Sequence, residues 1–138
     1  MYHSHPVTIY YEDTDLSGVV YHANYFKYFE RAREELLGVP ELARVWTEQG
    51  VGFAVYKLEC TFRAPARHGD RLEVRTRVEV EGPWRSLFHQ SCWRAGEAKP
   101  LVEGLVQLVC IDREGKLVQT PESLISSLRA MEEARAPH

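Results

Sequence analysis

YYEDTDLSGVVYHANYFKYFERAR, residues 10–33, is the stretch that decides how this chain folds. Residues 2–11 carry apolar side chains on alternate positions, which predicts a strand entering the stretch. Residues 13–18, DTDLSG, predict a turn because Asp and Ser side chains compete for backbone hydrogen bonds and Gly18 tolerates a positive φ. From residue 23 to residue 37 the apolar positions follow a helical period. The stretch therefore places three carboxylates just before the N-terminus of a helix.

The helix over residues 23–37 is expected to bury one face and to expose the other. The apolar face recurs at offsets of four, three and four and comprises Tyr25, Phe29, Ala32 and Leu36. The charged face comprises Lys27, Arg31, Glu34 and Glu35. Gly38 and Pro40 then supply a helix stop, and residues 40–49 predict a short second helix that begins with proline in its first turn.

The rest of the chain is mostly strand-patterned. Strands are expected over residues 51–63, 72–80, 86–93 and 101–111, and the last of these is the most apolar and is expected to be central. Thr120, Pro121 and Glu122 have the capping pattern that begins a C-terminal helix. This order predicts a single α+β domain over residues 1–138, with a long antiparallel sheet against one main helix. One long helix covers a five-stranded sheet poorly, so pairing with a second copy is expected on burial grounds.

Composition excludes several classes of partner. The 138 residues include 17 basic and 20 acidic side chains, with a net charge of −3 and no long block of one sign, which argues against nucleic acid or an anionic membrane as the main partner. No segment has the length and apolarity of a membrane span or a signal peptide, so a cytoplasmic protein is expected. Three widely spaced cysteines, Cys60, Cys92 and Cys110, predict buried thiols and suggest neither a disulfide nor a metal site.

The acidic turn admits more than one role. Its carboxylates can simply cap the following helix. A calcium loop is disfavoured because Asn24 stands where a bidentate Glu is needed, and an Asp-x-Asp phosphotransferase needs a parallel sheet that this chain does not predict. Acyl transfer fits better, because N–H groups over residues 20–23 would open the helix unpaired and could bind a developing oxyanion. A carboxylate is the best nucleophile or base available, since no G-x-S-x-G elbow occurs.

The same stretch resembles the hot-dog-fold thioesterases of the 4-hydroxybenzoyl-CoA thioesterase class, and particularly the YbgC-like acyl-CoA thioesterases linked to the Tol-Pal system. The matching residues are Tyr11, Glu12, Asp13, Thr14, Asp15, Gly18, Val19, Val20, Tyr21, His22, Tyr25, Phe29, Glu30, Arg31, Ala32 and Arg33, followed by APAR at residues 64–67. The resemblance implies a long central helix wrapped by a five-stranded antiparallel sheet. It also implies a homodimer formed by sheet extension, often a homotetramer, with acyl-CoA bound between subunits.

Residue roles follow from the resemblance by position. It implies that Asp15 is the catalytic carboxylate, as nucleophile or general base, and that the backbone N–H of His22 polarises the thioester carbonyl. Tyr11 and the His22 side chain are the other matched site residues, and no metal or cofactor is implied. Parity alone would make Tyr11 a core residue, and Asp13 is expected to be a turn or capping residue.

Three arginines, Arg63, Arg67 and Arg85, are candidates for contacts with CoA phosphates. The activity expected from the resemblance is hydrolysis of an acyl-CoA thioester to a carboxylic acid and CoA. The alternatives are a hot-dog hydratase or dehydratase and a non-catalytic acyl-CoA binding module.

Overall fold

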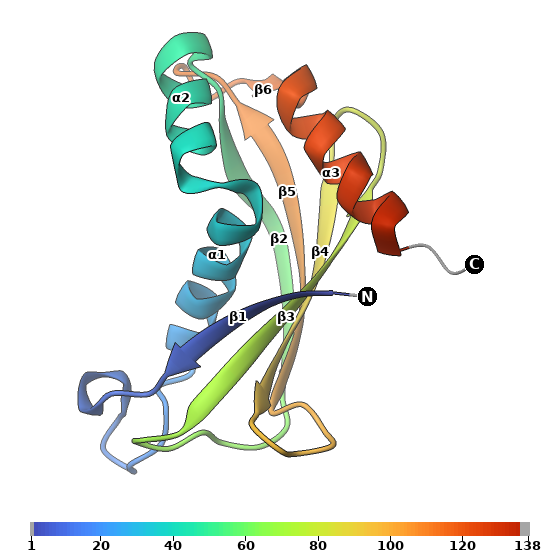
Figure 1. Cartoon of the computed structure of the whole chain (residues 1–138). Helices are drawn as coiled ribbons and strands as arrows, with labels where there is room; N and C mark the ends of the chain where they lie inside the picture. The colour runs from blue at the N-terminus through green and yellow to red at the C-terminus, as the bar shows by residue number, and fades with distance from the viewer. Residues whose placement is uncertain (1, 136–138) are drawn as a thin grey trace.

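The period-two segments form strands and the helical-period segments form helices in the computed structural model, which describes residues 2–135 (Figure 1). The strands are β1 His3–Thr8, β2 Gly52–Phe62, β3 Arg71–Val80, β4 Ser86–Arg94, β5 Val102–Ile111 and β6 Leu117–Val118. The helices are the short 3₁₀ segment η1 Tyr11–Asp13, α1 Asn24–Leu37, α2 Val39–Gln49 and α3 Glu122–Arg135. The predicted α+β class with one antiparallel sheet is confirmed, and the two-residue β6 is an addition that the sequence did not predict.

The strands pair in the order β1-β3-β4-β5-β2, with β6 attached to the end of β5. The middle strand is therefore β4, and the expectation that residues 101–111 form the central strand is wrong by one position. β5 is nevertheless an interior strand, because β2 pairs along its outer edge, from Gly52 opposite Ile111 to Phe62 opposite Val102. The edges of the main sheet are β1 and β2.

One face of the sheet holds the core, where α1 packs on β3, β4 and β5. Phe29 and Ala32 of α1 are fully buried, as their spacing predicts. Gly104 of β5 leaves room for the Phe29 ring, since a Cβ there would lie 2.9 Å from its Cε2 atom. Leu128 of α3 joins a cluster with Leu36 of α1, so α3 packs on the same face. Among residues 2–135, none of the helices combines the length and apolar character needed to cross a lipid bilayer.

The first strand is shorter than its sequence pattern predicts. It ends at Thr8, and Tyr11 opens η1 instead of extending the strand to residue 11. Side-chain hydrogen bonds explain the early end, because the Asp13 carboxylate accepts the N–H of Tyr10 at 2.8 Å and Thr14 Oγ1 donates to the carbonyl of Tyr11 at 2.7 Å. These local bonds hold the chain in a turn.

Candidate active site

The acidic turn is a tight loop that ends against α1. The N–H of Asp15 donates to the carbonyl of Val19 at 2.8 Å, and the N–H of Gly18 donates to the carbonyl of Asp15 at 3.0 Å. Gly18 has a φ of 82°, which an L side chain adopts only with strain, so glycine is required at this corner. An isolated bridge between Thr14 and Val20 closes the loop and fixes the position of Asp15.

The two carboxylate oxygens of Asp15 have different surroundings. Oδ1 accepts hydrogen bonds from the hydroxyl of Ser17 at 2.7 Å and from its N–H at 2.9 Å. Among the described residues, no donor lies within hydrogen-bond distance of Oδ2. The hydroxyl of Ser17 is the main reason that the pKa of Asp15 is lowered from its usual value. The side chain is exposed, so it is ionised near neutral pH with one oxygen free.

The start of α1 offers fewer open N–H groups than the sequence suggests. Of residues 20–23, Val20 donates to the carbonyl of Ala66 at 2.9 Å and Tyr21 donates to the carbonyl of Asp13 at 2.9 Å. No acceptor within the described residues takes the N–H of His22 or Ala23, and no side chain caps the helix. The open donors that could bind an oxyanion are therefore those of His22 and Ala23.

Two further side chains hold the loop against the helix. Asn24 Nδ2 donates to the carbonyl of Asp13 at 2.9 Å, across the mouth of the turn. The hydroxyl of Tyr25 accepts the N–H of Ala66 at 3.2 Å, and burial raises the pKa of this phenol. Sequence reasoning missed the roles of Ser17 and Asn24. Ser two positions after Asp is a usual Asx-turn spacing and could have indicated the first of them.

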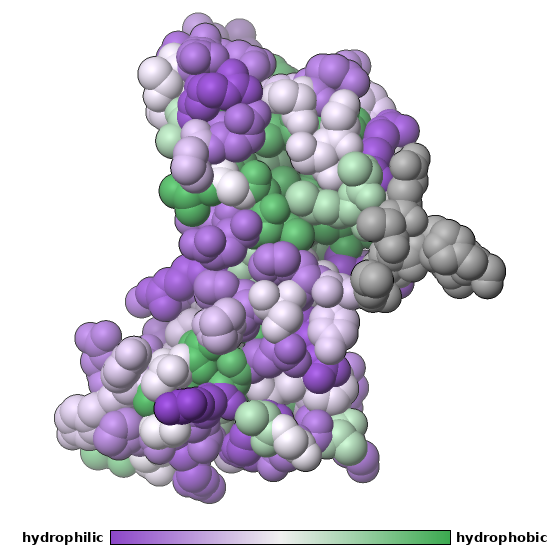
Figure 2. Space-filling view, viewed as in Figure 1, coloured by the Kyte–Doolittle hydropathy of each residue, from purple (hydrophilic) through white to green (hydrophobic). Residues whose placement is uncertain are grey.

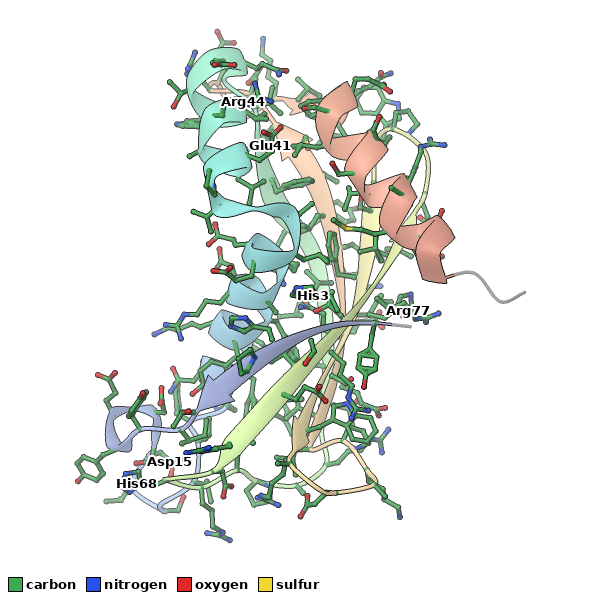
Figure 3. The ribbon with its side chains drawn as sticks, viewed as in Figure 1. His3, Asp15, Glu41, Arg44, His68 and Arg77 are labelled. Atoms are coloured by element: carbon green, nitrogen blue, oxygen red, sulfur yellow. The ribbon has the colours of Figure 1, made fainter. Side chains whose placement is uncertain are left out.

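The two aromatic site candidates are exposed at this end of the molecule. The His22 ring packs at 4.6 Å from Tyr21 and edge-on at 6.1 Å from Phe62, the last residue of β2. Tyr11 is 79% exposed and meets His68 edge-on at 6.1 Å, so the inward position suggested by parity is wrong. Figure 3 shows Asp15 and His68 at the same end of the molecule, below the start of α1.

The arginine candidates differ in their partners. Arg63 is paired with Glu103 at 2.6 Å, and Arg85 lies 3.7 Å from Glu81. Arg67 bridges to Val19 of the acidic loop through its backbone, and the described residues give its side chain no ion pair. Of the three candidates, Arg67 is therefore the one that lies beside the loop of Asp15 with its charge unpaired.

The cysteines are poor nucleophiles. All three are free thiols, and Cys92 and Cys110 are buried as predicted, whereas Cys60 is half-buried. Burial raises the pKa of each thiol, that of Cys92 to about 12, so thiolate is scarce at neutral pH. Residues 2–135 contain no cluster of His, Cys, Asp and Glu side chains arranged to hold a metal ion.

Known proteins share both the sequence and the fold. Residues 10–131 match the model of the thioesterase-like superfamily. The acyl-CoA thioester hydrolase YbgC of Escherichia coli is 38% identical over 126 residues, covering 91% of this chain and 91% of that protein. The acyl-CoA thioesterase YbgC of Haemophilus influenzae is 40% identical over 112 residues, covering 79% and 80% of the two chains. A 1,4-dihydroxy-2-naphthoyl-CoA thioesterase from Synechocystis, at 23% identity, superimposes with a TM-score of 0.85 over 96% and 98%, so the expected hot-dog fold is confirmed.

Proposed function

Since this chain belongs to the thioesterase-like superfamily, we propose that it hydrolyses acyl-CoA thioesters to a carboxylic acid and CoA. The observation that carries the proposal is that the segment from Asp15 to the start of α1 holds both an ionised carboxylate with an open Oδ2 and the open N–H of His22. Hydrolysis of a thioester needs a base or nucleophile and a donor for the oxyanion, and no metal.

The proposed reaction uses these groups in order. The thioester oxygen accepts the N–H of His22, and Asp15 either attacks the carbonyl carbon or removes a proton from an attacking water. The tetrahedral oxyanion collapses with cleavage of the carbon–sulfur bond, and the CoA thiolate takes up a proton. If Asp15 attacks, water then hydrolyses the resulting anhydride. The exposed side chains of Tyr11 and His22 are proposed to contact the substrate.

A carboxylate exchange tests the proposal. Asp15→Asn is expected to lower kcat for thiol release from acyl-CoA by about 10² or more, because it removes the anionic oxygen and keeps the shape. The matched control is Glu12→Gln, an exposed carboxylate of the same segment, which should keep the wild-type rate. A folded Asp15→Asn protein with wild-type kcat would refute the mechanism.

The same assays separate the rival functions. Hydration of an enoyl-CoA without thiol release would identify a hydratase. Tight acyl-CoA binding without thiol release, unaffected by Asp15→Asn, would identify a binding module.

A second copy is proposed to complete the site. The edge strand β2 exposes large apolar side chains along its length: Val55, Tyr56, Leu58 and Phe62. An unpaired apolar edge is a template for another strand, so a dimer formed by pairing two β2 edges, or a tetramer of such dimers, covers it. Phe62 also packs against His22, which brings this edge to the proposed catalytic loop.

Free thiols are usual in a reducing compartment, and we propose a cytoplasmic location, which cell fractionation would test.

A further inference from the structure

Two adjoining hollows open between α1 and β2. One, of about 170 Å³, begins at Phe26 in the first turn of α1 and is lined by Phe29, Leu58 and Val106. The other, of about 160 Å³, lies at the far end of α1 and is lined by apolar residues of the neighbouring elements: Leu37, Leu42, Val45, Phe53, Leu108 and Leu124. Figure 2 shows apolar side chains in the hollow between α2 and α3. Glu30, Arg33 and Val55 line both hollows, so the two hollows adjoin along the helix, and we refer to them together as the trough.

Arg33 places a buried cation in the wall of this trough. Its side chain is on α1, and the residue is only 7% exposed. Its Nη1 donates to Gln90 Oε1 at 2.9 Å, and the described residues give it no ion pair. Burial lowers the pKa of Arg33, and the neighbouring carboxylates of Glu30 and Glu34 oppose that shift. Among the described residues, no nitrogen of Arg33 is fully buried without a hydrogen-bond partner, so its remaining N–H groups keep contact with solvent, and a ligand that covers them must supply an acceptor.

The uncharged polar side chain that is bonded to Arg33, that of Gln90, cannot serve a ligand in the same way. Gln90 Nε2 already donates to the carbonyl of Phe29 at 2.9 Å and to Thr76 Oγ1 at 3.0 Å. Gln90 is thereby oriented with its oxygen towards Arg33. Within the described residues, the charged donors that remain for a ligand are the other N–H groups of the Arg33 guanidinium, which has five in all.

We propose that the trough receives the acyl group of the thioester and that Arg33 selects acyl groups with a neutral oxygen acceptor, a hydroxyl or oxo group, over plain aliphatic chains. This specificity rests on the proposed function. A plain chain lying against the guanidinium would remove its water and offer no hydrogen bond in return, which disfavours that ligand. A carboxylate on the acyl chain would be repelled by Glu30 and Glu34, which favours a neutral acceptor.

The position of Arg33 suits a group on the distal part of an acyl chain. It follows His22 by eleven residues, a rise of roughly 16 Å along the helix at 1.5 Å per residue. Long helical side chains point back towards the N-terminus, so the guanidinium lies closer to the open N–H of His22 than this rise. The selected oxygen is therefore expected well along a medium-length chain.

Binding of unreactive analogues tests the proposal apart from turnover. Calorimetry would compare S-alkyl-CoA thioethers, which cannot be hydrolysed, with their ω-hydroxyalkyl counterparts over a ladder of medium chain lengths. The wild-type protein is expected to bind the hydroxylated analogue about tenfold or more tightly at one length, since hydrogen bonds to charged groups contribute that much. Absence of such a preference at every length, or absence of binding, would overturn the proposal without any variant.

Variants then assign the preference to Arg33. Arg33→Met is expected to erase it, with tighter binding of the plain analogue and weaker binding of the hydroxylated one. The matched control is Arg31→Met, an arginine that lines a separate hollow against β1 and should keep the preference. Equal weakening of both ligands in Arg33→Met would indicate a structural role and refute the proposal. Failure of the proposed function would appear separately, as no thiol release from any acyl-CoA.

Discussion

Gly104→Ala tests how closely α1 packs on the sheet beneath the proposed trough. The new Cβ would lie 2.9 Å from Phe29 Cε2 and 3.4 Å from the carbonyl oxygen of Glu59. Carbon atoms pack best at about 3.5–4.0 Å, and the Phe29 ring is fully buried, so it has little room to withdraw. Overpacking of this kind costs about 1–3 kcal/mol, and alanine recovers about 0.4–1 kcal/mol by stiffening the unfolded chain. We expect a net loss of about 1–2 kcal/mol.

Thermal unfolding at a fixed protomer concentration measures this loss. For a chain of this size 1 kcal/mol corresponds to roughly 3–4 °C in Tm, so Gly104→Ala is expected to melt about 3–8 °C below the wild type. Gly52→Ala is the matched control, because Gly52 also lies in a strand and its Cβ would meet Trp46 at an ordinary 3.4 Å. The control should be neutral or slightly stabilised. A Gly104→Ala protein as stable as Gly52→Ala would refute the packing argument.

Two further predictions concern the acid limb of activity and the subunit edge. Ser17→Ala removes the hydroxyl that lowers the pKa of Asp15, so that pKa should rise and the acid limb of kcat/KM should move to higher pH. A pH profile identical to that of the wild type would show that Asp15 does not govern the limb. Tyr56→Asp places a charge on the exposed β2 edge and is expected to shift the protein towards monomers in analytical ultracentrifugation, with loss of activity. An active monomer would contradict a site shared between copies.

The elements with a strong local signal were predictable from the sequence. The apolar stripe of α1 and the alternation of β3 describe faces that must be buried, and both are buried in the structure except at Leu36 and Val80, which are half-buried. The strand pattern failed at Tyr11, because side-chain hydrogen bonds from Asp13 and Thr14 hold that segment in a turn. Arg33 was missed for another reason. Its burial depends on Gln90, which is 57 residues away, and no local spacing encodes such a pair.

The two aspartates of the acidic loop differ in what their bonds leave available. The half-buried Asp13 bonds across the loop, because its carboxylate accepts the N–H of Tyr10 and its carbonyl accepts the Asn24 amide. The Asp15 carboxylate is exposed, and within the described residues it accepts hydrogen bonds only from Ser17, through Oδ1, so its Oδ2 is open. A group that must change its bonding during a reaction needs such an open atom, whereas a group that fixes a loop needs none. On this argument Asp13 holds the loop in place, and Asp15 is the carboxylate that we propose to act together with the N–H of His22.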